Sequence, residues 1–405
     1  MSGPALDLRG PAHEVPPVSR AGTLAGVRLA IVTDTYQPQV NGVTRTLARL
    51  ADEATARGGD VEVHTASDPG ASPMPDVLRY PSTPFWAYPQ MRLAAPPFGG
   101  LARRLARFGP SLVHIATPFG LGLAGRRAAD RLGVPWVSSY HTHFTAYAEH
   151  YHLGALASVG WRYLRWFHNG GRRTYCPSRA VADEITAHGF RRVDVWGRGV
   201  DAEMFSPAFR SLELRRSLGI RDHELVVAYV GRLAREKGID DLLGAGHRLC
   251  AGPSTPAVRL LVVGEGPYMS ACMTRADGSA VFTGRQAGMA LSRLYASADL
   301  FVMPSITETF GNVTLEAMAS GVPVIAADCA VTRELLPAAA GVCYAAGDVE
   351  GLAEAILRLA RDPAARRAMG LAGRAAALAR SWTAIFGALF ADYRRVLAGR
   401  PPGGA

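Results

Sequence analysis

The chain has 405 residues, 48% of them apolar, and this length exceeds what one hydrophobic core usually supports, so two domains are predicted. Its formal net charge of +10 suits an anionic partner such as a phosphosugar, an acidic lipid surface or a nucleic acid. The five cysteines form no CxxC pair or zinc-type cluster, which argues against a disulfide framework, and no segment has the ~18–20 apolar residues of a membrane-spanning helix.

The first segment, residues 1–24, is rich in Pro, Gly and Ala and lacks the basic start and apolar run of a signal peptide, so a disordered tail is predicted. From residue 25 onward, short apolar runs alternate with longer helical patterns, which indicates parallel α/β structure. The pattern breaks near residues 204–211 and then resumes. The strands are expected at 27–34, 61–65, 112–116 and 136–140, and again at 225–231, 258–264, 281–284, 300–305 and 322–327.

This alternation predicts two doubly wound, Rossmann-like domains, one over residues 25–203 and one over 204–380. An amphipathic helix is predicted over 381–398. Chemically rich segments follow the predicted strands: DTYQPQVNG, YHTHF, GRLAREKG and SITETFGN. Ligands of doubly wound sheets bind at the carboxyl ends of the strands, so one composite site between the domains is expected.

GRLAREKG, residues 231–238, places two cations, Arg232 and Lys237, beside the expected start of a helix, a setting that favours a diphosphate. Lys237 is the only lysine among 44 basic residues, which indicates that this position requires a compact ammonium. A solvated charged loop is the alternative.

Glu308 and Glu316 are eight positions apart in ETFGNVTLEAMA. A helix beginning at Gly311 would place Glu316 about two turns inside, facing inward. Two carboxylates can accept hydrogen bonds from vicinal hydroxyls, so the pair could hold a hexose and a ribose of one donor. One capping and one surface carboxylate is the alternative.

The segment TETFGNVTLEAMASGVPVIA resembles the signature of the retaining family 4 glycosyltransferases, and GRLAREKG resembles their diphosphate-binding motif. The segments DTYQPQVNGVTRTL and SSYHTHFTAYAEHY resemble the bacterial members that mannosylate or otherwise glycosylate lipid acceptors. The resemblance runs from residue 27 to about 398. It implies the α/β GT-B fold, two domains facing across a cleft, with the last helix crossing back to pack on the first domain. It also implies that the first domain, residues 25–203, binds the acceptor and that the second, residues 204–380, binds the nucleotide-sugar.

On the phosphate and base side, the resemblance implies that Arg232 and Lys237 bind the donor diphosphate, with Gly42 giving backbone room opposite them. The region of Gly284 and Arg285 would lie by the nucleobase.

On the sugar side, the resemblance implies that Glu308 binds hydroxyls of the transferred sugar and that Glu316 holds the ribose. His141 matches a family histidine beside the sugar, so His141 and Glu308 are the catalytic candidates. The backbone that would contact sugar and phosphate is that of Phe310, Gly311, Asn312 and Val313.

The family is usually described by a front-face mechanism, in which the leaving phosphate helps to deprotonate the acceptor; a carboxylate nucleophile is the alternative. No D-x-D triplet occurs, so no metal or other cofactor is expected. The paired spacing of His141 with His143 and of His150 with His152 is compatible with a metal site, but no cysteine or carboxylate cluster completes the ligand set.

The expected partners are a nucleotide-sugar and a lipid or glycan acceptor. Basic and aromatic residues mix over 99–110 and 160–175, which fits either peripheral contact with an anionic membrane or helices packed on a core. Nucleic acid is not expected, because neither stretch lies in a recognised binding motif. The expected location is the cytoplasm, and peripheral association with the inner face of the cell membrane is compatible with it.

GDP-mannose is the favoured donor, with UDP-glucose or another UDP-sugar as the alternative. A dinucleotide-dependent oxidoreductase is discounted because VVGEGPYM, residues 262–269, has Met269 where the third glycine is required. A phosphorylase or sugar-nucleotide epimerase is disfavoured by the EKG loop and the glutamate pair. A binding-only pseudoenzyme has no support, since all the candidate residues are present.

Overall fold

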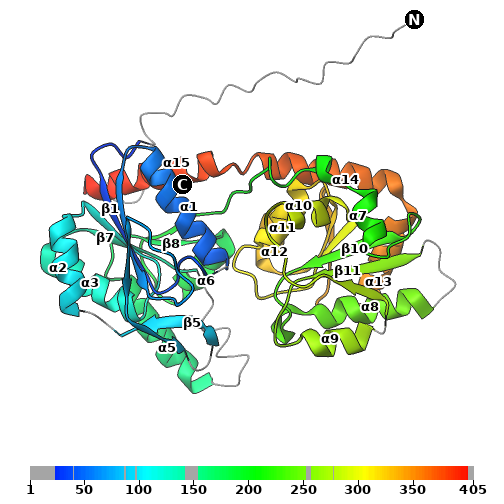
Figure 1. Ribbon diagram of the computed structural model, residues 1–405, viewed down its shortest axis with the longest axis horizontal. Coiled ribbons are helices and arrows are strands. Elements are labelled where there is room, and N and C mark those ends of the chain that lie inside the picture. The colour runs from blue at the N-terminus through cyan, green and yellow to red at the C-terminus, as the bar shows by residue number, and fades with distance from the viewer. Residues whose placement is uncertain are drawn as a thin grey trace, which may run out of the picture.

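The computed structural model describes residues 23–39, 41–85, 88–95, 98–141, 154–251, 257–276 and 278–399. Two α/β units lie side by side, each built on a parallel sheet covered by helices (Figure 1). The expectation of two doubly wound units is therefore confirmed.

The first sheet has the strand order β3-β2-β1-β6-β7-β8-β9, with an additional β4-β5 hairpin. Its strands are β1 (Arg28–Thr33), β2 (Asp60–Ala66), β3 (Val77–Tyr80), β4 (Ser82–Phe85), β5 (Tyr88–Ala94), β6 (Leu112–Ile115), β7 (Trp136–Ser139), β8 (Thr174–Cys176) and β9 (Val193–Val195). Its helices are α1 (Gly42–Ala56), α2 (Phe98–Phe108), α3 (Gly120–Leu132), α5 (Gly154–His168) and α6 (Arg179–Ala187).

The second sheet has the order β12-β11-β10-β13-β14-β15. Its strands are β10 (Leu225–Val230), β11 (Val258–Val263), β12 (Ala280–Phe282), β13 (Leu300–Met303), β14 (Val324–Ala327) and β15 (Gly341–Tyr344). The helical segments are η2 (Pro207–Phe209), α7 (Leu212–Ser217), η3 (Arg235–Lys237), α8 (Ile239–Ala251), α9 (Met269–Ala276), α10 (Gly288–Ala296), α11 (Asn312–Ala319), α12 (Ala330–Leu335), α13 (Val349–Arg361), α14 (Pro363–Leu378) and α15 (Trp382–Leu397).

Both sheets are buried on two faces, which is why their strands read as continuous apolar runs rather than alternating ones. All six residues of β10 are buried, as are the four of β6 and of β13. In each sheet the strand order reverses beside the first strand, next to β1 and next to β10. Loops at the carboxyl ends of these strands are where an open α/β sheet binds its ligands.

The last helix, α15, returns to the first unit and packs on its core, as the resemblance implied (Figure 1). Phe386, Phe390 and Tyr393 are fully buried in the same cluster as β1 and α1. The outgoing and returning connections lie against each other, because Val200 bridges to Ser381. A Cβ at Gly199 would stand 2.8 Å from the backbone nitrogen of Trp382, so the contact requires glycine.

A buried ion pair fixes α15 to the first sheet. Arg173, before β8, donates from Nε and Nη2 to the two carboxylate oxygens of Asp392 on α15, at 3.1 and 3.3 Å. The Tyr175 hydroxyl also donates to Asp392, at 2.6 Å, and both members of the pair are almost fully buried. Breaking such a pair leaves an uncompensated charge in the interior.

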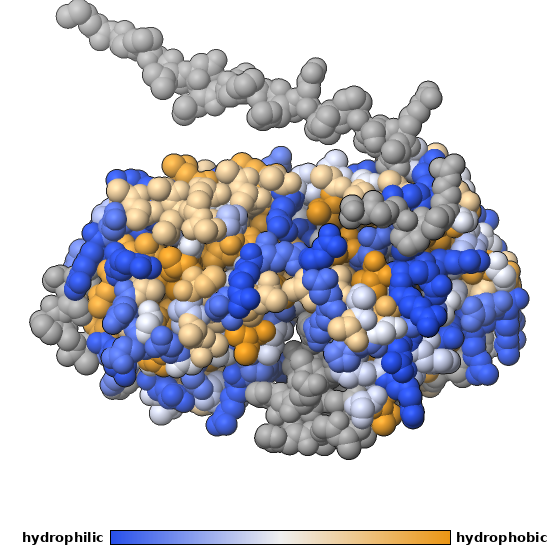
Figure 2. Space-filling view, turned by 180° about the vertical axis from the view of Figure 1, so that it is seen from behind, coloured by the Kyte–Doolittle hydropathy of each residue, from blue (hydrophilic) through white to orange (hydrophobic). Residues whose placement is uncertain are grey.

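The predicted tail, residues 1–24, lies outside the described residues apart from Thr23 and Leu24. Leu24 is fully buried in the cluster formed by β1, α1 and α15, so the packed chain begins ahead of the predicted boundary. Among the described residues, no helix is both long enough and apolar enough to cross a membrane. Seen from behind, weakly hydrophobic residues cover the upper edge of the second unit, where α14 exposes Leu371 and Leu378 (Figure 2).

We expect Asp392→Ala to lower the free energy of unfolding by up to about 3–5 kcal/mol, because the buried Arg173 would lose its two-oxygen partner and keep only the longer, 3.5 Å contact with the more exposed Asp194. The double variant Arg173→Met/Asp392→Leu should recover most of that loss, and chemical denaturation measures both. Asp60→Ala, in the exposed pair with Arg28, is the control and should cost less than about 1 kcal/mol. A loss in Asp392→Ala no larger than in this control would contradict the role given to the pair.

Candidate functional site

The GRLAREKG loop follows β10 and turns back before α8. Its turn depends on Gly238, which has φ +65° and lies so close to Pro304, after β13, that a Cβ would stand 2.5 Å from the Pro304 carbonyl oxygen. The loop thereby presents Lys237, whose Nζ donates to Oε1 of Glu308 at 2.6 Å. Arg232 pairs more loosely with Glu236, at 3.7 Å. The predicted diphosphate ligands therefore lie on a loop held against the end of β13.

Glu316 lies on the buried face of α11. The helix starts after Gly311, which adopts the left-handed conformation (φ +90°), so Glu316 is its fifth residue, a little over one turn inside rather than the two turns expected. The Tyr295 hydroxyl donates to its Oε2 at 3.0 Å, and Arg45 of the first unit donates to its Oε1 at 3.3 Å. Burial raises the pKa of Glu316 above 4.5, against the opposing effects of Arg45 and Tyr295.

The N-termini of α1 and α11, one from each unit, approach each other. A Cβ at Gly42, the first residue of α1, would stand 3.2 Å from Nδ2 of Asn312, the first residue of α11. Both helix starts have backbone N–H groups without intrahelical partners, and such groups attract anions. A side chain at position 42 would therefore have to displace the end of the Asn312 side chain by a few tenths of an ångström.

A second set of contacts joins the two units at α6. The hydroxyl of Ser178 donates to the carbonyl of Thr309 at 3.0 Å, next to Glu308. The Glu334 carboxylate, on α12, accepts the N–H groups of Arg179 and Ala180 at 2.9 Å each, so it caps a helix of the other unit. The loop that carries Glu308 is thus held from both units.

His141 follows β7 and is half-buried in the first unit. Its Nδ1 lies 2.9 Å from Nη2 of Arg198, and the Trp196 ring packs edge-on at 5.7 Å between centroids. Burial, and then the Arg198 charge, hold the pKa of His141 well below 6.5. The imidazole is therefore neutral at neutral pH.

The remaining predicted residues occupy two settings. Phe310 is buried in the core of the second unit and Val313 packs against it, so only their backbone could face a ligand. Arg285, after β12, is 3.8 Å from Glu265 on the exposed surface, and no hydrogen bond joins it to the other candidates within the described residues. The contacts therefore connect Gly42 to Asn312 and Lys237 to Glu308, and leave Arg285 at the periphery.

Three residues of the site were not predicted from the sequence: Arg45, Tyr295 and Arg198. Arg45 lies inside the quoted segment DTYQPQVNGVTRTL, but nothing in the spacing pairs it with Glu316, 271 positions away. Of the four histidines weighed as a metal site, His143, His150 and His152 lie outside the described residues. Among the described residues, no group of three His, Cys, Asp or Glu side chains is arranged to hold a metal ion.

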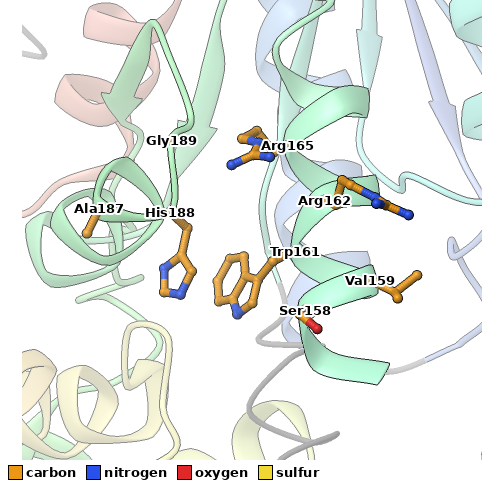
Figure 3. Close-up of a pocket in the computed structure, with 8 residues that line it drawn as sticks. All are labelled: Ser158, Val159, Trp161, Arg162, Arg165, Ala187, His188 and Gly189. Atoms are coloured by element: carbon orange, nitrogen blue, oxygen red, sulfur yellow. The ribbon is translucent and has the colours of Figure 1, made fainter. Parts of the chain in front are cut away.

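On the acceptor side, α5 uses its aromatic stripe mainly for packing: Leu164 and Phe167 are buried, as the core alternative required. Trp161 stacks on His188 at 3.7 Å and forms one wall of an open surface pocket of about 700 Å³ between α5 and α6 (Figure 3). Trp166 is 54% exposed, with the Arg126 guanidinium 3.9 Å from its ring centroid.

Two sequence families match most of the chain. Residues 40–204 match the family described as Glycosyltransferase Family 4, and residues 224–362 match the one described as Glycosyl transferases group 1. A GDP-mannose-dependent alpha-mannosyltransferase of Mycobacterium tuberculosis is 36% identical over 382 residues, 92% of this chain and 98% of that protein. The alpha-monoglucosyldiacylglycerol synthase of Streptococcus pneumoniae is 32% identical over 317 residues, 74% of this chain and 71% of that protein.

Solved structures with the same arrangement share much less sequence. Sucrose-phosphate synthase of Thermosynechococcus elongatus superposes with a TM-score of 0.75 at 21% identity, over 92% of this chain and 100% of that one. Anabaena HepE in complex with UDP and glucose superposes with a TM-score of 0.72 at 21% identity, over 91% and 100%. At this identity the likeness shows the fold alone.

The raised pKa of Glu316 predicts a pH dependence of stability. Because the folded protein holds the carboxyl proton more tightly than the unfolded chain, the free energy of unfolding should fall as pH rises above about 4.5. In Glu316→Gln, which does not titrate, this contribution is absent. Denaturation of both proteins at pH 4.5, 5.5 and 7 should therefore show that the free energy of unfolding of the wild type falls relative to that of the variant as pH rises. A relative gain by the wild type would mean that Arg45 outweighs burial.

Proposed function

The chain belongs to glycosyltransferase family 4 and is a glycosyltransferase of the GT-B fold, and from this premise we propose that it is a retaining α-mannosyltransferase using GDP-mannose. The observation that carries the proposal is the Lys237–Glu308 ion pair in the second unit, together with the contact of Glu316, on α11, with Arg45 of the first unit. The donor is supported by the mycobacterial relative's name and its 36% identity over nearly its whole length.

The diphosphate of the donor fits between Lys237, Arg232 and the facing helix starts. Two cations and unpaired backbone N–H groups compensate a doubly charged group better than either could alone. Gly42 and Asn312 approach each other there, so the phosphates would contact both units at once. Binding would in this way hold the cleft closed around the reacting groups.

The carboxylates then exchange partners. Without a ligand, Glu308 accepts from Lys237 and Glu316 accepts from Arg45 and Tyr295. When the phosphates take Lys237, Glu308 is released for hydroxyls of the mannose, while Glu316 accepts from the ribose hydroxyls. A buried carboxylate keeps hydrogen-bond partners in both states, which limits the cost of the exchange.

The transfer proposed here needs no protein nucleophile. The bond between mannose C1 and the diphosphate oxygen breaks, the acceptor oxygen bonds to C1 from the same face, and the acceptor proton passes to the leaving diphosphate. Lys237 and Arg232 stabilise the charge that develops on the diphosphate. Among the described residues no group of three His, Cys, Asp or Glu side chains is arranged to hold a metal ion, and Lys237 and Arg232 supply positive charge for the diphosphate, so the reaction is proposed to be metal-independent.

The acceptor is proposed to be a lipid or a glycan, bound on the first unit. The name of the streptococcal relative, a diacylglycerol glucosylating synthase, supports a lipid. A UDP-sugar donor and a binding-only protein are the competing outcomes of the two experiments below.

The first experiment compares GDP, UDP and ADP as ligands. The preferred nucleotide at 100 times its dissociation constant should stabilise the chain by about 2.7 kcal/mol, measured as a rise in the unfolding transition. We expect GDP to do so and UDP to give a much smaller rise at equal concentration. A larger rise with UDP would replace the donor, and no rise with any nucleotide would remove the donor site.

The second experiment separates binding from turnover. Lys237→Ala and Glu316→Ala should each weaken GDP binding by about 10–100-fold, since each removes a charge-assisted hydrogen bond. His141→Ala should leave GDP affinity nearly unchanged and lower kcat by about 100-fold. Titration calorimetry measures the affinity, and release of GDP from GDP-mannose measures kcat. Glu350→Ala, on the exposed surface of α13, is the control. Equal loss of affinity in all three variants would contradict these roles, and binding without turnover in the wild type would indicate a pseudoenzyme.

A further inference from the structure

The side chain of Arg198 is fixed in the interior of the first unit, after β9. It is 5% exposed, and its Nη1 donates to the carbonyls of Trp196 and Gly197 at 2.7 and 3.1 Å. Its guanidinium carbon lies 4.8 Å from the centroid of the Trp196 ring. With these contacts in place, Nη2 is aimed at Nδ1 of His141, 2.9 Å away.

This contact determines which nitrogen of His141 carries the proton. A guanidinium has N–H donors and no acceptor, so Nδ1 of His141 must accept with its lone pair. The proton of the neutral imidazole is therefore on Nε2. If both ring nitrogens were protonated, the Nδ1–H group would point at an N–H donor of Arg198. The positively charged imidazolium would then also lie against the positively charged guanidinium in a buried site.

The other titratable groups that face His141 or Arg198 are uncharged at neutral pH. Burial lowers the pKa of His114, on β6, and of His168, at the end of α5, to about 3 each. Burial raises the pKa of the Cys176 thiol, on β8, to about 12. Burial lowers the pKa of Arg198 only to about 10, so its guanidinium is positively charged at neutral pH. Among these described side chains it is therefore the charged one.

The Nε2 atom of His141 is buried and has no hydrogen-bond partner among the described residues. Buried polar groups without partners are rare, and they require an explanation such as a ligand or a catalytic role. An N–H group in this position can be satisfied by a ligand oxygen but not by a ligand N–H or O–H hydrogen.

We propose that Arg198 is a positioning residue that holds His141 as the Nε2–H tautomer, so that His141 donates a hydrogen bond to an oxygen of the transferred sugar. His141 then does not act as a base, because its remaining lone pair is engaged by Arg198. That the accepting oxygen belongs to the transferred sugar rests on the proposed function, whereas the assignment of the tautomer does not.

The tautomer can be read directly from the wild-type protein. Two-bond proton–nitrogen NMR spectra of the chain with ¹⁵N-labelled histidine distinguish a protonated from an unprotonated ring nitrogen, and His141→Gln assigns the signals. We expect His141 to show protonated Nε2 and unprotonated Nδ1 from pH 5.5 to 8. Protonated Nδ1 anywhere in this range would overturn the proposal.

Arg198→Met removes the donor while keeping a long apolar side chain. We expect His141 to titrate nearer its ordinary pKa of 6.5 and to populate both tautomers, and kcat to fall about 10-fold with a new decline on the acid side. Arg198→Lys, which retains a donor, should recover part of kcat and the Nε2–H signal. Arg103→Met, at an exposed position on α2, is the matched control.

The outcomes separate the two proposals. If GDP-mannose is not turned over, the proposed function fails while the wild-type spectrum still tests the tautomer. If Arg198→Met loses activity with the tautomer and pH profile of His141 unchanged, Arg198 is structural and the inference is wrong. If that variant does not fold, the wild-type spectrum and Arg198→Lys decide.

Discussion

Glu316 imposes the constraint on which the rest of the site depends, because a carboxylate buried in a protein needs partners that replace its lost hydration. Tyr295 supplies one partner from the same unit, and Arg45 supplies the other from across the cleft. Lys237 and Glu308 satisfy each other in the same way. These charged groups are thus compensated without a ligand, and under the proposed function the donor would replace those internal partners with its own phosphates and hydroxyls.

This exchange requires that the two units keep a close and defined approach, and the connections between them provide it. The two connections between the units touch at Gly199 and Trp382, where α15 begins. The Arg173–Asp392 pair then anchors α15 to the first unit. Most of this frame could be predicted, because strands buried on both faces are long apolar runs. The strands β8 and β9 could not, since three residues each with polar members, such as Thr174–Cys176, carry no periodicity and form through their neighbours in the sheet.

The site was predictable where chemistry is local in sequence and not where it depends on contacts between distant segments. The lone lysine and the inward face of α11 follow from composition and helix geometry, whereas the turn at Gly238 was seen only in the structure. The depth of Glu316 was overestimated: the helix starts at Asn312, after Gly311 in a left-handed conformation, and Glu316 is its fifth residue, a little over one turn inside rather than two. The partners Arg45 and Arg198 come from another unit or another strand, and no spacing rule selects one arginine among 43.

We propose that the site binds a nucleotide-sugar by exchanging these internal partners, and a crystal structure of the chain with GDP-mannose is the decisive test of this exchange. We expect Nζ of Lys237 to contact the diphosphate, Glu308 to contact the hexose, and Glu316 to accept hydrogen bonds from the ribose with Arg45 displaced. A bound donor that leaves both the Lys237–Glu308 and Arg45–Glu316 pairs intact would contradict it.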